Sequence, residues 1–585
     1  MNEGPEPHRH APIPWPWLIL LLLIVVPALI AAFFVKENVR GKKGWLKCRQ
    51  ELEAKGAVLD WASYGPAPVP DASNIYEVPN MDAWFVRRAN AALGGPNSGP
   101  LAHLPPLQYG SSNRVTIAEF KVATTSNASQ EVWQLNSPAT REKARKLVRE
   151  LYGPTLRAVM GPYLITRELE ARKAPEIYLE ENGPVPTNTI RNLFPTNSLL
   201  KGKIRIRVEN CGTNCFQAWM VPPQHVAAAD YLVWSDRATN NLEVIRSALK
   251  RPFARIDDSY QQPYQMRVPN FIAIRSVAQT LAQRSQSYLL LKQPEAALYE
   301  LTLLSDLSRL LTAEPEGKPI PLVSAMINVA LSGLYCGVVA DGLGLHAWPA
   351  QQLLSIQQQL KQKDLVSLVC RAFETERAMV CFTYQSSSPS QLNNFYFGTP
   401  FTKNVWANLK DPEFWLLSST PKGWMYDLMT AFATHVQQDL ESLNRTNQLL
   451  MPRKLDESAR KAEVKFRRFS PYSYLTAIYT PNYGPLWQRL GANQALLAEA
   501  LIACALERYR LAEKDYPEKL DGLVPRFLDK LPHDIIGGQP LKYRRTDQGK
   551  YLLYSIGWNE KDDGGTARAT DFSQGDWVWE NEKEW

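Results

Sequence analysis

A run of 25 residues without a charged side chain lies near the start of the chain, from Ala11 to Val35, and is almost wholly apolar from Trp15 onward. A helix rises about 1.5 Å per residue, so its last 21 residues can cross the ~30 Å hydrocarbon core of a bilayer. Trp15 and Trp17 occupy an interfacial position. A cleaved signal peptide is the alternative, but the length of the run disfavours it. The run predicts one transmembrane helix over residues 15–35, which would make the membrane a partner of this chain.

The residues flanking this run leave the side of the membrane open. The N-terminal tail carries only Arg9, whereas six basic residues follow the run: Lys36, Arg40, Lys42, Lys43, Lys47 and Arg49. Counted by the positive-inside rule, they place the body in the cytoplasm. They also suit a charged helix lying outside the membrane, expected from Gly44 to Gly56.

The composition describes a large globular protein. Of its 585 residues, 45% are hydrophobic and 21% are charged, which excludes a disordered or fibrous chain. At roughly 150 residues per domain, three or four structural units are expected. The net charge of +8 is too small for this length to indicate nucleic acid as a partner.

Changes in composition divide the chain into successive segments. The fold class that we expect is mainly α: an N-terminal transmembrane helix, a solenoid-like body of helical hairpins and a small α+β C-terminal module. The expected segments are a tail over 1–14, the transmembrane helix over 15–35, a juxtamembrane helix over 36–64, a Pro/Gly-rich connector over 65–136, a mixed α/β region over 137–265, a helical-hairpin array over 266–382, an aromatic-rich insertion over 383–425, a helical region with a connector over 426–496, and the C-terminal module over 497–585.

The helical-hairpin array has the clearest periodicity. Ile274, Val277 and Leu281 recur at helical spacing, and further helices are predicted to begin at Pro294, near Pro321 and after Pro349. Short turns between them predict antiparallel neighbours. No regular 34-residue period is present, so a plain helical core without a binding groove is the alternative.

Two cysteines are close in sequence. Cys211-Gly-Thr-Asn-Cys215 could form a disulfide across a tight turn or half of a metal site. No second Cys/His pair stands nearby, which disfavours a metal. A disulfide between Cys211 and Cys215 is expected if the body is exported.

Familiar catalytic motifs are absent from the sequence. It holds no phosphate-binding glycine loop, no His-Glu-x-x-His and no Gly-x-Ser-x-Gly, and its seven histidines are widely separated. We therefore expect a protein that is not an enzyme. An active site assembled from distant residues is the alternative.

Acidic residues gather on a loop near the C-terminus. Two predicted strands, over residues 540–545 and 550–555, lead into a Gly-containing loop that carries Asp562, Asp563 and Asp571. Calcium prefers six to eight oxygen ligands on such loops, and these carboxylates would repel one another without a cation. The sequence predicts calcium as a cofactor here, with an acidic surface hairpin as the alternative.

The order of features over residues 500–579 resembles the C-terminal domain of the major pseudopilins of type II secretion systems. These features are a long helix, Tyr516-Pro517, Leu531-Pro532-His533-Asp534, a hairpin, and Ser555-x-Gly557 before the acidic loop. The resemblance implies a calcium loop with Asp562, Asp563 and Asp571 as side-chain ligands and Ser555 as a carbonyl ligand. Asn559 stands where the family has an acid, and the N-terminal processing signal is lacking.

The whole chain also resembles a family of large bacterial single-span membrane proteins without an assigned activity. The segments that carry this resemblance are residues 51–56 and 68–71, the array from Pro269 and residues 505–512. It implies membrane anchoring, and together with the pseudopilin resemblance it favours an extracytoplasmic, periplasmic body over the cytoplasmic one. We expect a non-enzymatic scaffold of the cell envelope that binds a protein partner. The alternatives are an accessory component of a secretion or pilus-like machine and an envelope hydrolase.

Overall fold

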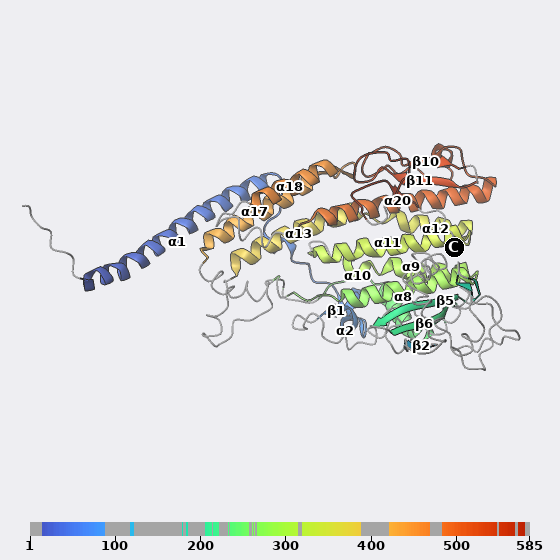
Figure 1. The fold of residues 1–585 in the computed structure, drawn as a ribbon, viewed down its shortest axis with the longest axis horizontal. Coiled ribbons are helices and arrows are strands. Elements are labelled where there is room, and N and C mark those ends of the chain that lie inside the picture. Colours follow the sequence, from blue (N-terminus) through green and yellow to red (C-terminus); the bar gives the residue numbers. More distant parts are fainter. Residues whose placement is uncertain are drawn as a thin grey trace, which may run out of the picture.

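One helix, α1 (Trp15–Ala54), runs unbroken through the predicted membrane segment and the charged segment after it. In this computed structural model it projects from one end of the helical body (Figure 1). The sequence analysis separated a transmembrane helix from a charged helix that begins near Gly44. That division is wrong, because residues 36–44 contain no proline and the helix continues through both of their glycines, Gly41, which is packed against another helix, and Gly44.

The structure describes residues 15–87, 118–121, 178–179, 183–184, 205–212, 215–221, 235–256, 266–313, 319–387, 420–467, 482–546, 549–567 and 571–579, with a few single residues between them. The side chains of α1 are described from residue 23. The predicted helix over residues 139–152 and most of the aromatic-rich insertion lie outside these ranges. Within them the fold is mainly helical with small antiparallel sheets, as the sequence predicts.

The four helices predicted for the array are present and confirmed. They are α8 (Phe271–Leu290), α9 (Pro294–Asp306), α11 (Leu322–Gly344) and α12 (Ala350–Lys361), followed by α13 (Leu365–Ser386); the short α10 (Arg309–Thr312) precedes α11. The predicted apolar positions Ile274, Val277 and Leu281 of α8 are completely buried. Helix α8 packs against α9 and α11. These helices form layers that lie roughly along the long axis of the molecule (Figure 1).

A long helix from the distal part of the chain completes this body. Helix α20 (Gly484–Glu513) packs against α11, α12 and α13. Its Ala500, Ile502 and Leu506 are fully buried. One continuous hydrophobic cluster therefore runs from Ile75, near the start of the body, to Trp579 in the C-terminal module.

Helix α17 (Lys422–Glu441) connects the body to α1. The C-terminal half of α1 packs along α17, and a separate hydrophobic cluster fills the seam with Trp45, Cys48 and Leu52 from α1 and Leu428, Met429 and Ala433 from α17. Helix α18 (Pro452–Arg467) packs in turn on α17. The outer half of α1 lies beyond this contact (Figure 1).

The C-terminal module contains the predicted hairpin and one strand more. Strands β10 (Lys542–Arg545) and β11 (Tyr551–Ser555) are antiparallel, with Lys542 opposite Tyr554. Strand β12 (Trp577–Val578) adds to the other edge of β11, with Ser555 opposite Trp577. A short 3-10 helix, η8 (Leu520–Leu523), links α20 to this sheet.

The described start of the Pro/Gly-rich connector lies across the body, although it forms little regular structure. It contains η2 (Asp71–Ser73), η3 (Ile75–Glu77), α2 (Met81–Phe85) and β1 (Val86–Arg87), which pairs with β7 (Val268–Pro269); η1 (Trp61–Tyr64) comes just before it. Ile75, Met81 and Phe85 are fully buried. The Tyr76 hydroxyl donates to the carbonyl of Leu310 at 2.8 Å. These contacts tie the connector to the helical array.

The described part of the mixed region contains both strand and helix. Strand β6 (Cys215–Val221) lies between β5 (Arg205–Gly212) and β2 (Ala118–Lys121) in one antiparallel sheet, and β3 (Tyr178–Leu179) pairs with β4 (Gly183–Pro184). Then follow η6 (Asp236–Ala238) and α7 (Thr239–Ala248). A further small pair, β8 (Leu443–Asn444) with β9 (Leu449–Leu450), follows α17.

Candidate functional site

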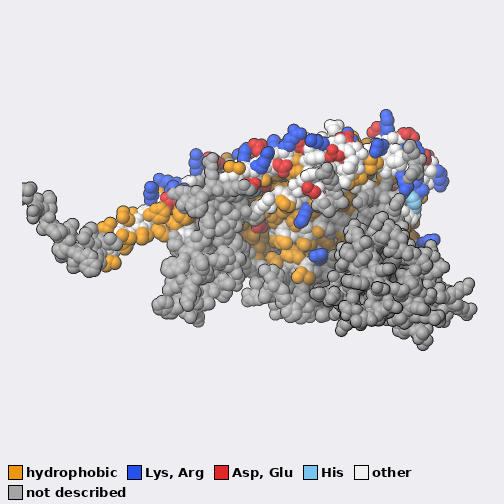
Figure 2. Space-filling model, in the orientation of Figure 1, with side chains coloured by type: hydrophobic (Ala, Val, Ile, Leu, Met, Phe, Trp, Pro, Cys, Tyr) orange, Lys and Arg blue, Asp and Glu red, His pale blue; other side chains and the backbone are white. Residues whose placement is uncertain are grey.

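The apolar face of α1 is exposed in the structure. Its large hydrophobic side chains between residues 23 and 35 are 41–65% exposed: Leu23, Ile24, Val25, Val26, Leu29, Ile30, Phe33 and Val35. Figure 2 shows these side chains as a continuous apolar sleeve on the projecting helix, followed directly by basic side chains. An apolar surface of this extent on a projecting helix indicates that something other than water covers it.

Among the described residues, two helices of the body are long and apolar enough to cross a membrane. They are α11 and α20, and 56% and 72% of their most apolar stretches are buried inside the protein. This burial identifies them as core helices, with neighbours on most sides.

Charged side chains hold α1 and α17 together where the apolar sleeve ends. Arg40 donates to both carboxylate oxygens of Asp427, at 3.2 and 2.5 Å, and to Glu37 at 3.0 Å. The Trp424 indole donates to Glu37 at 3.2 Å. Burial alone would raise the pKa of Glu37, but the hydrogen bonds from Arg40 and Trp424 outweigh it and lower that pKa. Glu37 is therefore held as a carboxylate inside the helix pair.

The predicted calcium ligands lie on or beside one loop, but the structure gives each its own protein partners. Asp562 accepts hydrogen bonds from the Tyr554 hydroxyl at 2.9 Å and from Gly564 N–H at 3.1 Å, and it pairs with Lys542 at 3.2 Å. Asp563 accepts from the amide of Asn559 at 2.8 Å. Within the described ranges, no three His, Cys, Asp or Glu side chains converge as metal ligands would.

The remaining two predicted ligands lie apart from this pair. Asp571 is exposed and accepts from the backbone N–H and the hydroxyl of Ser573. Ser555 is fully buried, and its hydroxyl donates to Asp534 at 2.8 Å. Calcium binding at Asp562, Asp563, Asp571, Ser555 and Asn559 stays a prediction.

The buried acid of this loop is one that the sequence analysis did not select. Asp576 is 2% exposed and accepts from the backbone N–H groups of Asp563 and Gly565, at 3.2 and 2.7 Å. Burial first, and then the neighbouring carboxylates of Asp563 and Asp562, raise its pKa. The loop therefore does crowd negative charge, as its composition predicts.

The two neighbouring cysteines lie on adjacent strands. Cys211 ends the regular part of β5 beside an irregularity in the pairing, and Cys215 begins β6 opposite Gly212. Their side chains lie outside the described set, so the disulfide between Cys211 and Cys215 stays a prediction. The described cysteines, Cys48, Cys336, Cys370, Cys381 and Cys504, are buried and reduced.

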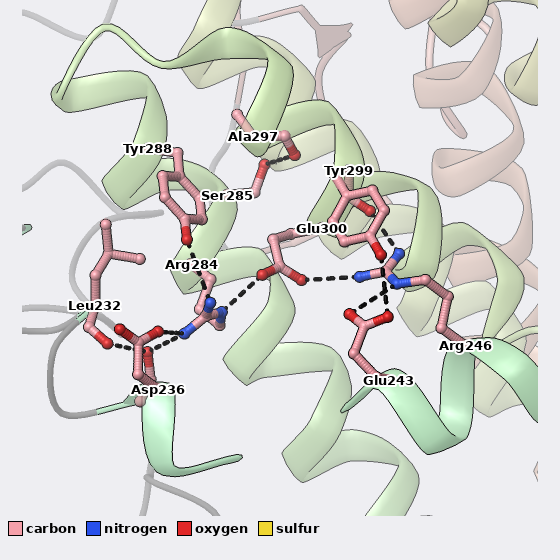
Figure 3. Close-up of polar contacts among 11 residues, drawn as sticks. Leu232, Asp236, Glu243, Arg246, Arg284, Ser285, Tyr288, Ala297, Tyr299 and Glu300 are labelled. Carbon is pink, nitrogen blue, oxygen red and sulfur yellow. Dashed lines mark hydrogen bonds and ion pairs between the residues drawn. The ribbon is translucent and has the colours of Figure 1, made fainter. Parts of the chain in front are cut away.

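A buried charged network joins three helices of the body (Figure 3). Glu300 on α9 lies between two arginines: it accepts from Arg284 of α8 at 2.8 Å and from Arg246 of α7 at 3.3 Å. Arg284 and Glu300 have side chains only 4% and 7% exposed. Burial opposes the charge of Arg284, but attraction to Glu300 and hydrogen bonds to Glu300 and Asp236 outweigh it and raise the pKa of Arg284.

Further contacts hold both arginines of this network. Arg284 also donates to the hydroxyls of Ser235 and Tyr288, at 2.7 and 3.3 Å. Arg246 lies over the ring of Tyr299, 3.5 Å from its centroid, and donates to the Tyr299 carbonyl at 2.9 Å. Every charge of the cluster thus has an opposite partner inside it, which is how a buried ion pair is tolerated. The network fastens η6 and α7 to the α8–α9 hairpin.

A serine, a histidine and an aspartate also meet inside the body, beside α17. Ser458 donates to Asp439 at 2.8 Å and lies 3.4 Å from Nδ1 of His435, the same nitrogen that faces Asp439 at 3.9 Å. In a hydrolytic triad the serine and the acid contact opposite ring nitrogens. Here all three are buried and Trp487 also donates to Asp439. These side chains therefore form a hydrogen-bonded network inside the core.

A polar cavity of about 280 Å³ lies where α11 and α20 end against the β10–β11 turn. Its centre is Glu507, which accepts from Arg510 at 2.6 and 2.8 Å, from His346 Nδ1 at 3.0 Å and from the Tyr516 hydroxyl at 3.1 Å. Burial would raise the pKa of Glu507, but the bonds from Arg510 and His346 outweigh it and lower that pKa.

The sequence analysis selected none of these cavity residues. His346 and Glu507 are separated by 161 positions, and no spacing rule links them. The only local signal is that His346 and Lys514 lie at the C-terminal ends of α11 and α20, where basic residues are common anyway.

No protein-family model, curated protein or solved structure significantly matches this chain. Its function is therefore inferred from its own residues.

Proposed function

We propose that this chain is a single-pass, membrane-anchored and non-enzymatic scaffold of the bacterial cell envelope, whose helical body binds a protein partner. The proposal rests on helix α1. Its outer half carries the exposed apolar sleeve, and the same unbroken helix continues into an inner half that packs on the body. Burying exposed apolar surface is favourable by about 25 cal/mol per Å². A lipid bilayer supplies that burial over the length of the sleeve.

The partner-binding role is supported by exposed apolar side chains at one end of the array. Ile272 and Val323, in the first turns of α8 and α11, are 58% and 47% exposed. Helices α8 and α11 pack together, and we propose that these two side chains belong to one surface. We propose that this surface contacts the partner and that the body lies outside the cytoplasm.

Membrane retention tests the anchor. We expect wild-type protein to remain in membranes washed with alkaline carbonate and Ile24→Lys/Leu29→Lys to be released, since each central lysine disfavours insertion by about 2.5–3.5 kcal/mol. Leu46→Lys, on the packed half of α1 and 47% exposed, is the matched control and should be retained. Release of wild-type protein would refute the anchor, and protease protection in spheroplasts would report the side of the body.

Purification from solubilised membranes tests the scaffold role. We expect a stoichiometric partner that is lost in Ile272→Asp/Val323→Asp and kept in Val464→Asp, a control on α18 that is 61% exposed. A purified chain that turned over a substrate, with the activity abolished by one side-chain change, would contradict a non-enzymatic role.

An accessory role in a secretion or pilus-like machine is the second candidate. It is favoured by the order of the C-terminal module, in which a long helix, α20, leads into the antiparallel sheet β10–β11–β12. Co-purification with components of such a machine would support it over a general scaffold.

A further inference from the structure

The polar cavity at the ends of α11 and α20 has the features of a ligand site. Two helices end at it, and each continues into a residue with left-handed backbone: His346 at φ 50° and Lys514 at φ 68°. At α11 the N–H groups of His346 and Ala347 bond back to Leu343 and Gly342, and at α20 the N–H of Lys514 bonds back to Arg510. Glycine is the usual residue at such a position because it has no Cβ to strain.

At the end of each helix, the position where glycine is favoured is occupied by a basic residue, His346 or Lys514. The side chain of that residue lines the cavity. A basic residue in the last helical turn would complement the helix dipole equally well without left-handed backbone. Strained residues of this kind concentrate at functional sites. The side chains of His346 and Lys514 thus lie in the lining of one cavity.

The charges around the cavity favour a negatively charged ligand. Arg510, Lys514 and Lys550 line it on the basic side, and Glu507 and Asp515 on the acidic side. Both acids are engaged: Glu507 by Arg510, and Asp515 by Arg545 at 2.5 Å. Among the described lining residues each acid is thus paired with an arginine, and Lys514 adds a further positive charge to the cavity.

The buried carboxylate also orients the histidine. Nδ1 of His346 lies 3.0 Å from Glu507 and 3.2 Å from the Arg510 guanidinium, so this ring nitrogen is engaged by the protein in either tautomer. Nε2 is then the ring nitrogen left for a ligand, and the imidazole is about half exposed. Arg510, which bonds Glu507 twice, is a positioning residue in this arrangement.

We propose that this cavity binds a small anionic molecule through a phosphate or carboxylate group, with Lys514 and His346 contacting its oxygens. The volume of about 280 Å³ lies at the lower end of small-molecule sites, which favours a ligand smaller than a dinucleotide. The rings of Tyr516 and Tyr551, in edge contact at 4.8 Å, form an aromatic wall for the rest of the ligand. The proposal is independent of the scaffold role.

Thermal melting of the full chain in detergent tests this site, with inorganic phosphate and citrate as probes and chloride at matched ionic strength. We expect a saturable rise in melting temperature for wild-type protein. His346→Gly and Lys514→Gly should fold, because glycine suits left-handed backbone, and should bind at least tenfold more weakly. A response to phosphate alone or to citrate alone would show which group the site takes.

The matched control is Lys292→Gly at the end of α8. Lys292 is also exposed and left-handed, at φ 58°, but it does not line the cavity. This variant loses the same charge and gains the same backbone freedom, so its probe affinity should equal that of wild type. Absence of a saturable shift with either probe in wild-type protein, or an equal loss in Lys292→Gly, would overturn the proposal.

Discussion

Gly41 of α1 and Gly423 of α17 lie backbone against backbone. A methyl group on Gly41 would overlap the carbonyl of Gly423, and one on Gly423 would overlap the backbone of α1 at Glu37. The N–H of Gly423 donates to the Asn38 side chain at 2.8 Å. The two helices can approach this closely only because neither position carries a side chain.

Replacing Gly41 should therefore loosen the attachment of α1. We predict that Gly41→Ala destabilises the protein by about 1–3 kcal/mol, the usual range for overpacking. Gly44→Ala is the control: Gly44 lies on the same helix with nothing within 4 Å of the added methyl. That change should stabilise the helix by about 0.5–1 kcal/mol. Denaturation of both variants in detergent checks this, and equal effects would contradict the close contact.

The buried charged network should respond strongly to loss of its central acid. Glu300→Ala would leave two arginines without their shared partner, and we predict a loss of about 3–5 kcal/mol. Glu51→Ala removes an exposed glutamate, 64% exposed, and should cost less than about 0.5 kcal/mol. A small effect of Glu300→Ala in chemical denaturation would show that water compensates the arginines.

Glu499 on α20 predicts a pH dependence of stability. Its side chain is 1% exposed, its Oε1 has no hydrogen-bond partner, and burial, followed by the nearby Asp534, raises its pKa well above the ordinary 4.5. The folded state thus favours the protonated acid. That contribution to stability is complete below about pH 4.5 and is lost as the pH rises through the raised pKa.

Glu499→Gln mimics the protonated acid and should stabilise the protein at pH 8, on the order of 1–3 kcal/mol, with little effect at pH 4. Glu507→Gln should have the opposite effect and destabilise the protein at pH 8. The pKa of Glu507 is lowered, so its contribution is present above pH 4.5 and is lost as the pH falls through that lowered value. Melting curves of both variants, from well below pH 4 up to pH 8, check the two signs, and parallel curves would refute them.

Calcium binding at the acidic loop is predicted to raise the melting temperature. At a hundredfold excess over its dissociation constant, a ligand specific to the folded state adds about 2.7 kcal/mol. Asp562→Asn/Asp563→Asn should remove that shift, while chelator should lower the melting temperature of wild type only. Melting curves unaffected by calcium would leave Asp562 as a surface acid held by Tyr554 and Lys542.

Local periodicity was sufficient to predict the helices of the array and the C-terminal hairpin. Ile274 and Leu281 are spaced for one helix face, and both are fully buried where that face meets its neighbours. Pro294 begins α9, as expected for a residue that lacks an N–H and suits the first helical turn. These features depend on residues only a few positions apart.

Contacts between distant segments were not predictable in this way. Gly41 meets Gly423, Arg284 meets Asp236, and His346 meets Glu507, and each pair depends on how whole helices are placed. The boundary expected after Val35 failed for a related reason. A change from apolar to charged residues changes the surroundings of a helix without ending it, because the backbone hydrogen bonds continue.

Because α1 is one continuous helix, a movement of its outer half is passed on to its inner half. A helix of 40 residues is about 60 Å long, and its inner half is fixed to α17 by interlocked backbones and the Arg40–Asp427 pair. If the outer half spans a bilayer, any change in its tilt is transmitted to α17 and from there to the body. The height and angle at which the body meets another molecule would then be set by membrane thickness.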